Sequence, residues 1–81
     1  MPGTVEVWRW RPYGFFGRWQ DYVVEAGALD DGRWYLRRLA HDIGGPWLAE
    51  LHRCRDEAMA AAKAVQAEVA EVLTAAGYRL L

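Results

Sequence analysis

In the first half of the chain, apolar and polar residues alternate with a period near two, which is typical of β-strands. The pattern predicts strands at residues 5–11, 19–29 and 33–40, each rich in β-branched and aromatic residues. A shorter fourth strand is predicted at 47–53. Pro12 should end the first strand, because proline cannot donate to the hydrogen-bond ladder of a sheet.

Turn residues separate these runs. Asp30-Asp31-Gly32 lies between two apolar segments and predicts a tight hairpin, because glycine readily adopts a positive φ. Residues 12–18 hold two glycines around two phenylalanines and predict a loop, and residues 41–46 predict a further turn. Gly27, near the end of the second strand, indicates a β-bulge.

From residue 57 to residue 76 the period changes to that of an amphipathic helix. Its apolar residues recur at spacings of three and four, and the predicted buried stripe consists of Ala58, Ala62, Val65, Val69, Val72, Leu73 and Ala76. Asp56 is the expected N-cap. Gly77 is the expected left-handed residue after the helix, with Tyr78 packing back on Leu73.

This order of elements predicts an α+β fold, with an antiparallel β-meander of three or four strands packed against one long C-terminal α-helix. We expect residues 1–81 to form a single domain. A stripe of alanine and valine lets the helix approach the sheet closely and leaves room for large sheet residues. The predicted core residues are Trp8, Trp10, Trp34 and Leu36. The second face of the sheet is left to water or to a partner.

The chain is dense in aromatic residues, with five Trp, four Tyr and two Phe among 81 residues. Ten of these eleven precede residue 50. So short a chain buries a small core, and small domains often gain stability by oligomerising. We therefore expect a homodimer that covers the second face of the sheet.

Composition restricts the remaining classes of protein. A net charge of −1 argues against a general nucleic-acid coat protein. Cys54 is the only cysteine, which excludes a scaffold held by intrachain disulfides. Residues 1–5 lack the basic region of a signal peptide, and no apolar run approaches the roughly 18 to 20 residues of a membrane span. A cytoplasmic location is the expectation.

Catalytic and metal sites find little support in the sequence. The chain has no serine, so a serine nucleophile is excluded, and its carboxylates are scattered. Cys54 with His52 is the one conceivable nucleophile–base pair, and we interpret it as a structural cysteine beside a surface histidine. Together with His41 and Asp42, these two residues are of types that bind zinc, but their spacing in the sequence is not that of a zinc site. We expect a protein that is not an enzyme and has no cofactor and no metal.

Two groups of residues are candidates for binding. The aromatic group lies in or beside the glycine-flanked loop, and the basic group lies on the first and third strands: Tyr13, Phe15, Phe16 and Trp19; Arg9, Arg11, Arg37 and Arg38. Aromatic residues and arginine are enriched at the centres of protein interfaces. We therefore predict a small, self-associating interaction module that recognises a protein partner through an aromatic- and Arg-rich sheet or loop surface.

A nucleic-acid-binding module is the alternative prediction. Arginines could hold phosphates while aromatic rings stack on bases. The same arginines could instead pair across strands with Glu6, Glu25 and Glu50.

The β-meander followed by a helix, together with Arg55-Asp56-Glu57-Ala58 at the helix start, resembles small β-β-β-α modules. Among these are the arm-binding domains of tyrosine recombinases. The resemblance implies a sheet that reads DNA, although this chain is less basic than those domains usually are.

Overall fold

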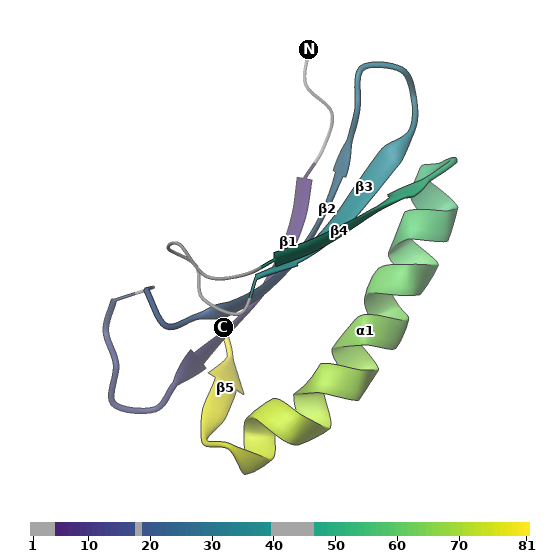
Figure 1. Cartoon of the computed structure of the whole chain (residues 1–81). Helices are drawn as coiled ribbons and strands as arrows, with labels where there is room; N and C mark the ends of the chain where they lie inside the picture. The colour runs from purple at the N-terminus through teal and green to yellow at the C-terminus, as the bar shows by residue number, and fades with distance from the viewer. Residues whose placement is uncertain (1–4, 18, 40–46) are drawn as a thin grey trace.

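The computed structural model describes residues 5–17, 19–39 and 47–81. Its elements are β1 (Val5–Pro12), β2 (Tyr22–Ala28), β3 (Trp34–Leu39), β4 (Trp47–His52), α1 (Arg55–Ala75) and β5 (Tyr78–Leu80). The strands form one antiparallel sheet in the order β4-β3-β2-β1-β5, and α1 runs along one face of it (Figure 1). The predicted α+β class, with a β-meander against one C-terminal helix, is confirmed.

The strand β5 is a feature that the sequence pattern did not predict. Gly77, with φ of +88°, reverses the chain after α1, as the prediction for this glycine requires. Tyr78–Leu80 then pairs with the end of β1, where Tyr13 N–H donates to the Gly77 carbonyl at 2.9 Å. The helix therefore crosses the sheet from the β4 side to the β5 side. Three residues are too few to show a strand period, so only the tertiary pairing reveals β5.

The register assigns each strand residue to a face, because residues directly opposite in an antiparallel pair share a side of the sheet. The face under α1 carries Trp8, Trp10, Tyr22, Val24, Ala26, Ala28, Trp34, Leu36 and Arg38. The opposite face, called the open face below, carries Val5, Val7, Arg9, Arg11, Val23, Glu25, Gly27, Tyr35, Arg37, Leu39, Ala49 and Leu51. The predicted alternation of β1 and β3 is confirmed.

The core lies between the sheet and the first half of α1. Ala58 and Ala62 are fully buried, and their small side chains bring the helix close to Trp10, Trp34 and Leu36. Trp8 packs against this cluster as a half-buried residue, as do Val65, Val69, Leu73 and Tyr78. The four predicted core residues are therefore correctly placed. Burying large aromatic side chains contributes the most hydrophobic stabilisation per residue.

Three details of the predicted helix are wrong. Ala76 was expected in the buried stripe, but it is exposed and is the C-cap of α1. Val72 is 67% exposed and does not belong to the packed stripe. Successive residues of an α-helix are rotated by 100°, so Val72 points away from the core when Leu73 points toward it. The N-cap is Cys54 rather than Asp56, and its side chain makes no capping hydrogen bond. Glu57 reaches back instead and accepts from the Arg53 backbone N–H at 3.1 Å, in the manner of a capping box.

The predicted hairpin between β2 and β3 is confirmed. Leu29 N–H donates to the Arg33 carbonyl at 2.8 Å, and Gly32 has a φ of +89°. The Asp31 carboxylate accepts from the Arg33 backbone N–H at 3.0 Å. The turn expected at 41–46 lies outside the described residues. Among the described residues, no helix has the length and apolar character needed to cross a membrane.

The packed stripe of α1 gives a direct test of the fold. Val69→Asp places a charge against the core cluster and should lower the free energy of unfolding by about 3 kcal/mol. Val72→Asp makes the same chemical change on the exposed side of the helix and should alter it by less than about 0.5 kcal/mol. Urea unfolding followed by circular dichroism measures both. Equal destabilisation by the two variants would contradict the helix orientation.

Candidate interaction surface

A buried carboxylate organises one end of the open face. Asp21 is 0% exposed and lies just before β2, opposite two arginines that share a face of β1. Arg11 donates to both carboxylate oxygens, from Nε at 2.9 Å and from Nη2 at 2.8 Å, while Arg9 Nη1 donates to Oδ2 at 3.0 Å. The bidentate geometry fixes the orientation of the Arg11 guanidinium group. Two of the predicted basic site residues are thus brought together around a carboxylate.

Burial alone would raise the pKa of Asp21, but hydrogen bonds from Arg11 and Arg9 outweigh it and lower that pKa below its usual value. Asp21 is therefore ionised at neutral pH. The sequence prediction missed this residue, although Arg-x-Arg on one strand face opposite an acidic residue was a usable signal.

A second ionic cluster occupies the middle of the open face. Arg37 contacts Glu25 on the adjacent strand, with Nε 2.8 Å from Oε2 and Nη2 donating to Oε1 at 3.2 Å. The Tyr35 hydroxyl donates to the same carboxylate at 2.7 Å. Burial and the hydrogen bond with Glu25 raise the pKa of Tyr35. The cross-strand pairing expected for Glu25 is present, whereas Glu6 lies 3.8 Å from Arg55 of α1 and Glu50 pairs with His52.

Gly27 lies beneath the ring of Tyr35. It pairs regularly with Val5 and Tyr35, so the predicted bulge is wrong. A Cβ atom on Gly27 would lie 2.6 Å from the tyrosine ring. The glycine is therefore explained by the close approach of an aromatic ring that reaches across it to Glu25.

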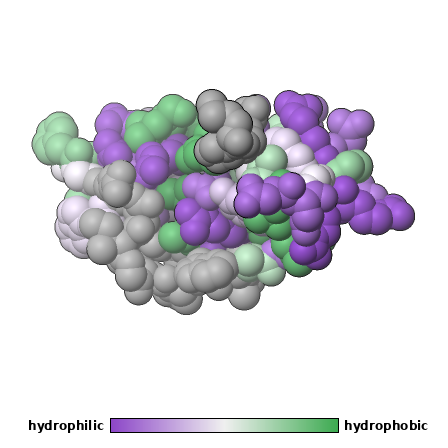
Figure 2. All heavy atoms as spheres, turned by 90° about the horizontal axis from the view of Figure 1, so that it is seen from above, coloured by the Kyte–Doolittle hydropathy of each residue, from purple (hydrophilic) through white to green (hydrophobic). Residues whose placement is uncertain are grey.

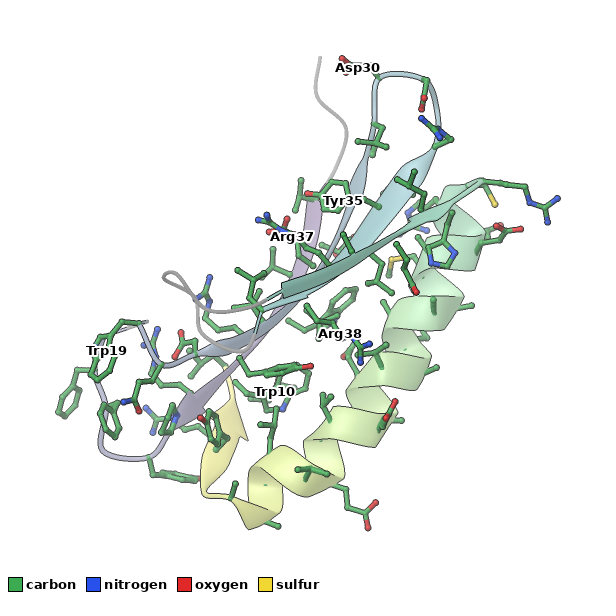
Figure 3. The ribbon with its side chains drawn as sticks, viewed as in Figure 1. Trp10, Trp19, Asp30, Tyr35, Arg37 and Arg38 are labelled. Carbon is green, nitrogen blue, oxygen red and sulfur yellow. The ribbon has the colours of Figure 1, made fainter. Side chains whose placement is uncertain are left out.

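Arg37 and Arg38 lie on opposite faces of the sheet. Figure 3 shows Tyr35 and Arg37 on the open side, and Arg38 on the same side as Trp10, between the sheet and α1. Arg38 lines a pocket of about 130 Å³ with Leu36, Ala49 and Glu50. A shallow depression of about 260 Å³ on the open face is bordered by Leu29, Tyr35, Arg37 and Ala49. The four predicted arginines therefore do not form one surface.

The predicted aromatic residues do lie together, in the loop between β1 and β2. Tyr13 is 65% exposed, Phe15 37%, Phe16 92% and Trp19 51%. Phe15 and Trp19 meet edge to face with ring centroids 5.7 Å apart, and Arg79 of β5 lies 5.3 Å from the centre of the Tyr13 ring. We call these four aromatic residues the aromatic loop.

In the view of Figure 2, hydrophobic and hydrophilic side chains are interleaved over the surface.

Two of the predicted thiol and metal candidates, Cys54 and His52, are described by the structure. Cys54 is exposed at the N-cap of α1, and His52 Nε2 lies 3.0 Å from Glu50 Oε1. His41 and Asp42 lie outside the described residues. Within residues 5–17, 19–39 and 47–81, no three potential metal ligands from His, Cys, Asp or Glu are grouped.

Comparison of the chain with protein-family models, with curated proteins and with solved structures finds no match. Its function is therefore inferred from its own surfaces.

Asp21 makes stability depend on pH. Its folded pKa is lowered, so its contribution is present above the unfolded pKa of about 3.9 and is lost as the pH falls through the folded pKa. Asp21→Asn should cost about 2 kcal/mol at neutral pH and should flatten the loss of stability on acidification. Asp31→Asn, which breaks an exposed pair with Arg33, is the control and should change the profile less. Identical profiles for Asp21→Asn and the unmodified protein would contradict this role.

The contact between Gly27 and Tyr35 predicts a coupled pair. Gly27→Ala should destabilise the protein by about 2 kcal/mol, because the new methyl group must displace the tyrosine ring. In a Tyr35→Ala background, the same change should cost at least about 1 kcal/mol less. A double-mutant cycle from denaturant unfolding measures this coupling. Additive effects would show that the ring does not need the glycine.

Proposed function

We propose that this chain is a non-catalytic interaction module that recognises a protein partner through the aromatic loop. The observation that carries the proposal is the exposure of four aromatic side chains in one short connection, with Phe16 92% exposed. Large aromatic residues supply most of the binding energy at many protein interfaces.

The loop is held in place before any partner binds. Tyr13 N–H donates to the Gly77 carbonyl at 2.9 Å, and Phe15 N–H donates to the Pro12 carbonyl at 3.3 Å. The edge-to-face contact between Phe15 and Trp19 orders the far side of the loop. Binding by an ordered loop loses less conformational entropy than binding by a flexible one.

The charges beside the loop indicate the chemistry of the partner. Arg79 of β5 lies over the ring of Tyr13 and is itself exposed. Arg11 of β1 is the residue directly opposite Arg79. A matching surface has an apolar pocket for Phe16 with acidic groups around it. Such a rim would favour association and select the partner by charge.

The arginines give the nucleic-acid alternative less support than the aromatic residues give to protein binding. Arg9 and Arg11 contact Asp21, Arg37 contacts Glu25, and Arg38 lies on the other face of the sheet. A phosphate would have to compete with these carboxylates for the same guanidinium groups.

Phe16→Ala should weaken partner binding without changing the fold. The side chain is almost fully exposed, so we expect an unchanged melting temperature and at least a tenfold weaker Kd for the partner, or about 1.4 kcal/mol. A photo-crosslinking amino acid at position 16 would capture the partner from the lysate of the source cell. Calorimetry with the purified partner would then compare the unmodified protein with its variants.

Val72→Ala removes an exposed apolar side chain from α1 and serves as the matched control. A partner that binds the Phe16→Ala and Val72→Ala variants equally would contradict the proposal. Gel shifts with random DNA and RNA, at low and physiological salt, test the alternative. Salt-sensitive binding that is lost when Arg37 and Arg38 are both replaced would favour a nucleic-acid binder.

A further inference from the structure

The strand β4 has one side without a neighbour in the described part of the sheet. It is six residues long and pairs with β3, whereas β5, at the opposite end of the strand order, has three residues. An unpaired strand edge presents N–H and C=O groups that can bind another strand. Neither proline nor lysine occurs within β4, so it lacks these common means of blocking an edge.

The hairpin hydrogen bond identifies which groups of β4 face outward. Leu29 and Arg33 form a hydrogen-bonded pair, and such pairs alternate along an antiparallel ladder. Tyr35 and Arg37 therefore bond to β2, and the residues between them bond to β4. It follows that Trp47, Ala49 and Leu51 direct their backbone N–H and C=O groups away from β3.

We propose that a second copy of this chain binds along β4 as an antiparallel strand, joining two sheets into one across a two-fold axis. Both copies then present their helices on the same side. Opposite residues must share a face, so each possible register is centred on one residue, which lies opposite the same residue of the second copy. The two-fold axis passes between these two residues. At least three residues of β4 lie opposite each other in registers centred on Leu48, Ala49, Glu50 or Leu51. Centring on Leu48 leaves Glu50 outside the paired residues of the strand.

The position of Glu50 selects the register centred on Leu51. Centring on Glu50 sets two carboxylates directly opposite each other, which is unfavourable. Centring on Ala49 sets Glu50 opposite Leu48, which carries no charge. Centring on Leu51 sets Glu50 opposite His52 of the second copy, twice by symmetry. Glu50 and His52 already lie 3.0 Å apart within one copy, so the dimer groups four complementary side chains.

The same register covers apolar surface. Leu51 is 58% exposed and would meet Leu51 of the second copy across the axis. Its N–H and C=O groups are among those that face outward, so backbone bonding and side-chain contact agree at this position. The aromatic loop leads from β1, on the far side of β2 and β3 from β4, and stays accessible in the dimer. Self-association is thus independent of partner recognition.

Disulfide trapping tests the register. In a Cys54→Ser background, Leu51→Cys places two thiols across the axis at about 5.5 Å between Cα atoms, which suits a disulfide. We expect oxidation to link this variant into dimers at least tenfold faster than the Ala49→Cys variant in the same background. Faster linkage of the Ala49→Cys variant would overturn the proposed register.

Charge exchange tests the pairing in solution. Sedimentation should show a dimer of the unmodified protein well above micromolar concentration, and Glu50→Lys should weaken it at least tenfold. The double variant Glu50→Lys with His52→Glu sets a lysine opposite a glutamate and should restore association. Circular dichroism checks that each variant is folded, and Phe16→Ala should dimerise normally. A monomeric unmodified protein, or a dimer unaffected by Glu50→Lys, would overturn the proposal while leaving partner binding through Phe16 untouched.

Discussion

One helix can cover only one face of a five-stranded sheet, and the arrangement of this protein follows from that constraint. The covered face carries the large buried side chains of Trp10, Trp34 and Leu36. They lie beneath the fully buried Ala58 and Ala62 of the helix. Small helix residues facing large sheet residues give close packing without voids. A shift of one residue in the strands would exchange the two faces and bring Arg9, Glu25 and Arg37 under the helix.

The open face is stabilised by different means. It buries polar groups by pairing them: Asp21 between two arginines, and Glu25 with Arg37 and Tyr35. A buried carboxylate without such partners would be strongly unfavourable. This arrangement has a functional consequence, since arginines engaged in neutralising carboxylates are poor phosphate ligands. The aromatic loop instead exposes large apolar side chains, with Phe16 the most exposed of them.

Much of the fold could be predicted because it depends on local periodicity. The meander, the hairpin at Gly32 and the core tryptophans follow from a period of two and from turn chemistry. Two features were missed because tertiary contacts decide them, whereas the errors at Val72 and Asp56 concern the exact rotation and start of the helix. The short β5 is defined only by its pairing with β1. Gly27 was interpreted as a bulge, although its role depends on the Tyr35 ring of the adjacent strand. The aromatic loop was predicted because its residues lie close together in the sequence, whereas Asp21 was missed because its partners, Arg9 and Arg11, lie on the neighbouring strand.

The two proposed surfaces differ in how they obtain specificity. At the aromatic loop, the rings supply affinity and the neighbouring arginine supplies selection by charge. At β4, any extended strand could satisfy the outward backbone groups, so specificity must come from side chains. The register centred on Glu50 is unfavourable because it places two carboxylates opposite each other. The register centred on Leu51 places Glu50 opposite His52 of the second copy. A single acidic residue on an edge strand can thus prevent indiscriminate pairing and still permit a defined symmetric contact.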